Sequence, residues 1–139
     1  YPELPGGRLA AAQGFKAGLK AAAARGALVY GECGGYMALG DGLIDADGNR
    51  HEMAGLLALE TSFATRRLHL GYRRLRAGQG FAFGRDLTAH EFHYSTALRE
   101  EGEPLFHAAD ATGAELGPAG LRRGNVMGSY MHIIDRAAP

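Results

Sequence analysis

The sequence predicts an α/β fold, and three neighbouring features carry that prediction. Apolar residues recur at spacings of three and four between Leu9 and Arg25, which is the pattern of an amphipathic helix. Gly26 is a natural stop for this helix, and residues 27–30 form a short apolar run typical of a strand buried on both faces. A second apolar helical pattern follows at residues 36–39.

The rest of the chain predicts mainly strands and turns. Residues 45–49 have the composition of a turn. Residues 100–103 and 110–120 have the composition of polar loops. A short final strand, residues 125–130, leads to His132. Apolar or partly alternating runs predict three more β segments, at residues 54–59, 66–76 and 88–97.

Length and composition limit the partners that this chain can have. Its 139 residues predict a single domain, residues 1–139, and because the chain opens on Tyr1 we expect it to be part of a longer protein. Fifteen basic and fifteen acidic residues give a formal net charge of zero. This argues against nucleic acid or an anionic membrane surface as a binding partner. A single cysteine and the absence of a run of about 20 apolar residues favour the cytoplasm.

The cysteine lies in a glycine-rich turn between the first predicted strand and the second helix. Gly31, Cys33 and Gly35 have the spacing of a nucleophile elbow, in which glycines avoid clashes around a strained nucleophile. This turn favours the thiolate at the start of a helix and directs the N–H of Gly34 at a developing oxyanion. The alternative is a small buried cysteine beside a glycine-rich turn.

A thiol nucleophile needs a base, and six histidines are available. His132 follows the last predicted strand, where a neighbouring strand end can bring it beside Cys33. The surroundings of His51, His69 and His107 are polar or turn-like, which predicts solvated surface positions.

The histidines of the segment HEFHYS, residues 90–95, raise the question of a metal site. His90 and His93 are three residues apart on a predicted strand and should face opposite sides, so we expect no metal. Glu91, His93 and Ser95 should share one face. That face either lines a pocket or is a partly solvated strand surface.

Four motifs, read together and in order, identify a family resemblance: GECGGYM at 31–37, LHLGYR at 68–73, HEFHYS at 90–95 and GSYMH at 128–132. The chain resembles, from Tyr1 to its end, the amidotransferase domain of cobyrinic acid a,c-diamide synthases. The resemblance implies a flavodoxin-like class I glutamine amidotransferase domain, truncated at its N-terminus. It also implies that the domain hydrolyses glutamine and passes ammonia to an ATP-dependent synthetase domain.

By the same resemblance, the synthetase domain amidates the a and c carboxylates of cobyrinic or hydrogenobyrinic acid in cobalamin biosynthesis. ATP and Mg²⁺ are implied for the full-length enzyme, and no cofactor for this part. Glutamine is the implied direct partner, and the corrinoid is reached through the synthetase domain. A sheet edge opened by truncation could also pair with a second copy, so a homodimer is one expected assembly.

The resemblance assigns roles to particular residues. Cys33 would attack the glutamine carboxamide, His132 would transfer protons, and Gly34 would donate to the oxyanion. Three residues resemble the segment that helps hold glutamine: His93, Tyr94 and Ser95.

Two departures from the family pattern matter. Many class I amidotransferases carry a glutamate two residues after the histidine to orient it, whereas this chain has Ile134 there, so that Glu91 is a conceivable substitute. The Pro-Gly-Gly loop that supplies the other half of the oxyanion hole would precede Tyr1, so that the chain by itself could be inactive.

Other functions remain open from the sequence. Within the same enzyme class, the domain could belong to cobyric acid synthase or to a cell-wall precursor amidase. It could also be a non-catalytic α/β module that binds a partner, or a cysteine hydrolase or isomerase built on the same elbow. An inert thiol would indicate the module, and reactivity toward substrates other than glutamine would indicate the hydrolase.

Overall fold

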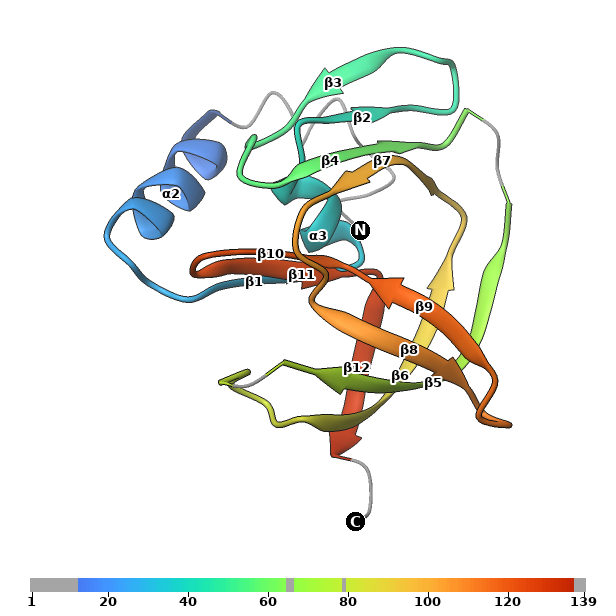
Figure 1. Cartoon of the computed structure of the whole chain (residues 1–139). Helices are drawn as coiled ribbons and strands as arrows, with labels where there is room; N and C mark the ends of the chain where they lie inside the picture. Colours follow the sequence, from blue (N-terminus) through green and yellow to red (C-terminus); the bar gives the residue numbers. More distant parts are fainter. Residues whose placement is uncertain (1–12, 65–66, 79, 137–139) are drawn as a thin grey trace.

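A computed structural model describes residues 13–64, 67–78 and 80–136 of the chain (Figure 1). The two described helices are α2 (Gln13–Ala24) and α3 (Gly34–Leu39). The described strands are β1 (Val29–Glu32), β2 (Gly42–Ile44), β3 (Arg50–Glu52), β4 (Ala58–Ser62), β5 (His69–Ala77), β6 (Asp86–His93), β7 (Thr96–Glu101), β8 (Phe106–Asp110), β9 (Glu115–Ala119), β10 (Leu121–Arg123), β11 (Val126–Ser129) and β12 (Met131–Arg136).

The strands form three sheets that lie one above the other (Figure 1). The middle sheet has the order β1-β11-β10, with β1 and β11 parallel. Above it in the view lies the sheet β3-β2-β4-β7, and below it the antiparallel sheet β12-β6-β5-β8-β9. The chain is thus a mixed α/β fold, as predicted, in which strands outnumber helices among the described residues.

Two hydrophobic cores lie on the two faces of the middle sheet. This division follows from the way successive side chains of a strand point to opposite faces of the sheet. Val126 of β11 belongs to one core, and the next residue, Met127, belongs to the other. The upper core centres on Tyr36 and Met37 of α3 with Leu59 of β4, all essentially inaccessible to solvent. Residues of the lower core include Leu75, Leu87 and Phe106, from β5, β6 and β8.

Helix α2 confirms the first amphipathic pattern over its described part. Leu19, Ala22 and Ala23 pack against the upper core. Gly26 ends the helix with a φ of 82°, a left-handed conformation that glycine adopts without penalty. The predicted beginning of this helix, residues 9–12, lies outside the described residues.

Several strand predictions need correction. The segment predicted as a strand at 54–59 is irregular up to Leu57, and β4 begins at Ala58. The predicted strand at 88–97 is divided between β6 and β7. The loop predicted at 110–120 contains β9, which pairs with β8. Its glycine and proline are typical of turns, and they led to the prediction of a loop. Similarly, β7 runs into the predicted loop at 100–103, and β11 is followed by a further strand, β12.

Candidate active site

The turn around Cys33 has the backbone of a strained elbow. Cys33 has a φ of 51° and a ψ of −106°, and it is the one residue other than glycine with positive φ in the described part of the chain. A non-glycine residue held in such a region costs on the order of 1–3 kcal/mol. The surrounding fold therefore keeps the cysteine in a conformation that it would not adopt alone.

The two elbow glycines do not have the same role. A Cβ atom on Gly31 would lie 2.7 Å from the carbonyl carbon and oxygen of Gly35 and 2.8 Å from the amide nitrogen of Tyr36. A Cβ atom on Gly35 would meet nothing within 4 Å. The prediction that both glycines relieve clashes is thus confirmed for Gly31 and wrong for Gly35.

Contacts from three elements fix the position of Cys33. Its N–H donates to the carbonyl of Ser129 at 2.9 Å, which continues the pairing of β1 with β11. Its carbonyl accepts the N–H of Met37 at 3.0 Å, the first turn of α3. The thiol Sγ lies 3.9 Å from the carbonyl oxygen of Phe92, to which it donates, and the residue is 5% exposed.

His132 lies on β12 and contacts Glu32, the last residue of β1. The parallel register pairs Glu32 with Ser129, and the chain turns after Ser129 to enter β12. His132 Nδ1 is 3.7 Å from Oε1 of Glu32, the residue before Cys33, and the His132 side chain is 48% exposed. The structure therefore places His132 beside the residue that precedes Cys33, while the action of Cys33 and His132 as a dyad stays a prediction.

A cavity of about 460 Å³ opens beside this end of β1. Its lining residues are Tyr30, Glu32, Phe83 and Ile133. Glu32 therefore contributes both to the cavity and to the surroundings of His132. A volume of this size is within the range of small-molecule pockets.

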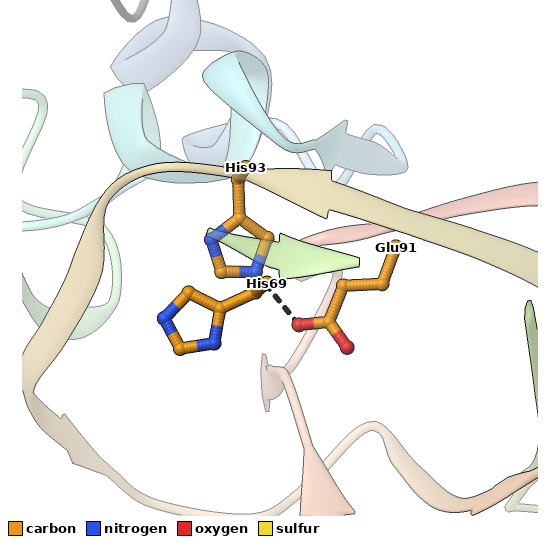
Figure 2. Close-up of side chains that lie close together, drawn as sticks. All are labelled: His69, Glu91 and His93. Atoms are coloured by element: carbon orange, nitrogen blue, oxygen red, sulfur yellow. Dashed lines mark hydrogen bonds and ion pairs between the residues drawn. The ribbon is translucent and has the colours of Figure 1, made fainter. Parts of the chain in front are cut away.

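His93 is the centre of a second group of polar side chains (Figure 2). It is 3% exposed, and its Nε2 lies 2.7 Å from Oε2 of Glu91 while its Nδ1 lies 2.9 Å from the carbonyl oxygen of Ser95. The other Glu91 oxygen accepts from Nε of Arg73 at 3.0 Å. Burial opposes the charge of Glu91, but the hydrogen bonds and charges of His93 and Arg73 outweigh it and lower the pKa of the carboxyl.

Both ring nitrogens of His93 face hydrogen-bond acceptors. A carbonyl oxygen only accepts, so Nδ1 carries a proton, and an ionised Glu91 likewise requires a proton on Nε2. His93 is therefore held between a carboxylate and a carbonyl, with an acceptor facing each ring nitrogen. Its ring stacks on Tyr130 with centroids 3.7 Å apart and on His69 with centroids 4.5 Å apart, an arrangement that favours a cation over an aromatic face.

His69 is not the solvated surface residue that its sequence surroundings predicted. It is partly buried on β5, opposite His93, and its Nε2 is buried with no hydrogen-bond partner among the described residues. Burial, followed by the neighbouring charge of His93, lowers the pKa of His69. His51 is also partly buried and lies 2.7 Å from Asp45, whereas His107 is exposed as predicted.

His69, Glu91 and His93 bring potential metal ligands within 4.8 Å of one another (Figure 2). The rings of the two histidines are nearly parallel, 14° apart, whereas nitrogen ligands of one metal must converge on it. Both carboxylate oxygens of Glu91 are already engaged. This geometry fits an ion-pair network better than a metal centre. His90 faces away from this group and contacts Tyr72, as its spacing predicted.

The residues predicted to hold glutamine are placed differently from one another. His93 and Ser95 are buried, so the alternative of a solvated strand face is wrong for both. Ser95 Oγ lies 3.2 Å from the Tyr130 hydroxyl and donates into the core. Tyr94 is 37% exposed and packs edge-on against Phe92. Direct contact with a ligand is therefore open to Tyr94, and the role of all three residues stays a prediction.

The sequence did not predict that Glu32 lies beside His132. It suggested Glu91 instead as the residue that orients this histidine. Glu91, the conceivable orienting residue, is held by His93 and Arg73, and the carboxylate beside His132 belongs to Glu32. The signal was present in the motif, because Glu32 directly precedes Cys33. A strand register was needed to show which histidine it meets.

A sequence profile described as the CobB/CobQ-like glutamine amidotransferase domain matches residues 1–138. The curated relatives that are similar to the chain include three proteins named hydrogenobyrinate a,c-diamide synthase. The Sinorhizobium protein is 56% identical over 99% of this chain and 32% of its own length. The Brucella anthropi protein is 58% identical over 97% of this chain and 31% of its own length. The Rhodobacter capsulatus protein is 53% identical over 96% of this chain and 31% of its own length.

The chain thus spans about a third of the length of these relatives. In the described part of the chain, no helix combines the length and the apolar character needed to cross a membrane.

Proposed function

Because this chain belongs to the family of CobB/CobQ-like glutamine amidotransferase domains, we propose that it forms the glutamine-hydrolysing site of an a,c-diamide synthase. The observation that carries the proposal is the backbone of Cys33, which is held in a strained conformation between β1 and α3. Structural cysteines have no need of such a conformation, whereas a nucleophile elbow requires it.

In the proposed reaction, the Cys33 sulfur attacks the side-chain carboxamide carbon of glutamine as His132 takes the thiol proton. The N–H of Gly34 donates to the oxyanion of the tetrahedral intermediate. His132 returns the proton to the nitrogen, the C–N bond breaks, and ammonia leaves a γ-glutamyl thioester on Cys33. Water, deprotonated by His132, then attacks the thioester and releases glutamate and the thiol.

The finer substrate assignment rests on the names of the relatives. We propose that the ammonia amidates the a and c carboxylates of hydrogenobyrinic or cobyrinic acid, within a longer protein that includes a synthetase part. ATP and Mg²⁺ would serve that amidation. The hydrolysis of glutamine itself needs neither, because the Cys33 thiol, a base and one water molecule account for every bond formed and broken.

The test is glutaminase activity in the complete gene product that contains this sequence. Cys33→Ser should lower kcat by at least about 1,000-fold, and His132→Ala by about 100- to 10,000-fold. His107→Ala is a matched control, because His107 is an exposed histidine on β8, and it should retain activity.

Alkylation of Cys33 by a glutamine-like electrophile separates the remaining functions. Protection by free glutamine is the result expected for an amidotransferase. Labelling that glutamine does not affect, together with an active Cys33→Ser protein, would contradict the proposal and favour another cysteine-dependent activity or a binding module.

A further inference from the structure

We propose that Glu32 positions His132 for proton transfer with Cys33. This inference rests on the proposed function, in which His132 takes the thiol proton. In the proposed arrangement, the Glu32 carboxylate accepts a hydrogen bond from Nδ1–H of His132, which leaves Nε2 as the nitrogen without a proton. Only such a nitrogen can accept the proton of Cys33.

The contacts of Glu32 divide between its two carboxylate oxygens. Oε2 accepts the hydroxyl of Tyr30 at 3.0 Å and the backbone N–H of Ile133 at 3.0 Å. These two donors fix the carboxylate, and the other oxygen, Oε1, then faces Nδ1 of His132 at 3.7 Å. That separation is within ion-pair range but longer than a hydrogen bond, so in the proposed arrangement the half-exposed His132 ring turns to bring Nδ1–H closer to Oε1.

Tyr30 keeps the Glu32 carboxylate in place. Burial, and next the negative charge of Glu32, raise the pKa of the Tyr30 phenol. The phenol therefore stays protonated and remains a donor to Oε2. A carboxylate held by two donors keeps its orientation while the histidine beside it gains and loses a proton.

The strand register explains how a residue next to the nucleophile reaches the base. Glu32 is the last residue of β1 and pairs with Ser129 at the end of β11. After Ser129 the chain turns into β12, and His132 is its second residue. Glu32 and His132 therefore meet where the two parallel strands end, which compensates for the apolar side chain of Ile134.

The tautomer of His132 tests this inference directly. In the complete gene product labelled with ¹⁵N-histidine, long-range ¹H–¹⁵N spectra should show neutral His132 protonated on Nδ1. In Glu32→Gln the amide NH₂ can donate to Nδ1, so the proton should move to Nε2. Glutaminase kcat should then fall by about 100-fold or more, as general-base catalysis is lost, while KM for glutamine changes by less than about threefold.

Two further variants separate positioning from folding. Glu32→Asp keeps a carboxylate and should retain the Nδ1–H tautomer with part of the activity. Glu101→Gln removes a carboxylate from an exposed ion pair with Arg99, and it should leave both the tautomer and kcat unchanged.

The outcomes distinguish this inference from the function on which it rests. An Nε2–H tautomer of His132 in the unmodified protein would overturn the role of Glu32. An unchanged kcat in Glu32→Gln would do the same, provided that Cys33→Ser is inactive. Glutaminase activity that survives Cys33→Ser would instead remove the proposed function itself.

Discussion

Replacing Gly31 by alanine inserts one methyl group into the tightest part of the elbow. The new Cβ would lie 2.7 Å from two backbone atoms of Gly35 and 2.8 Å from the Tyr36 nitrogen. These atoms belong to the first turn of α3, where the Met37 N–H donates to the Cys33 carbonyl, and Gly31 itself is held in β1 by pairing with β11, so that neither side can shift far. Forcing a methyl group into a packed region costs about 1–3 kcal/mol, and at backbone atoms we expect the upper half of that range.

Gly35→Ala is the matched control, because a Cβ there meets no atom within 4 Å. It lies in α3, where alanine is intrinsically more favourable than glycine by up to about 1 kcal/mol. Urea denaturation of both variants should therefore give a free energy of unfolding about 2–4 kcal/mol lower for Gly31→Ala than for Gly35→Ala. Equal midpoints and slopes for the two variants would refute the steric account of the elbow.

Two other variants test the buried network around His93. Glu91→Gln leaves the charges of His93 and Arg73 without their carboxylate and should cost about 3–5 kcal/mol at pH 7, measured by urea denaturation. Because the folded-state pKa of Glu91 is lowered, its contribution is present above the ordinary glutamate pKa and is lost as pH falls through the lowered value, so the difference between variant and wild type should shrink in acid. Ser95→Ala removes a buried donor to Tyr130 and should cost about 1–2 kcal/mol, whereas an unchanged midpoint would contradict that bond.

Local pattern predicted the elbow but not the strands around it. The spacing of Gly31 and Cys33 imposes a steric requirement that can be read from neighbouring residues, and in the structure a Cβ atom on Gly31 would indeed clash with the backbone of α3. Strand β9 has a glycine and a proline in its five residues, and its side chains are mostly exposed, so that only its pairing with β8 makes it a strand.

The same distinction holds for the site. The alternation of Glu91 and His93 on one face was predictable, because it depends only on strand geometry. The partners that lie across the sheet were not, since Arg73 and His69 reach this face through the antiparallel register of β5 with β6. The meeting of Glu32 with His132 likewise depends on the register of β1 with β11.

The most direct test of the central claim is mass spectrometry of the complete gene product quenched in acid during turnover of glutamine. We expect a γ-glutamyl adduct on the peptide that contains Cys33. Hydroxylamine should release this adduct, because it is a thioester, and the adduct should be absent in Cys33→Ser. Turnover of glutamine with no adduct at Cys33, or with the adduct on a different residue, would contradict the assignment of Cys33 as the nucleophile.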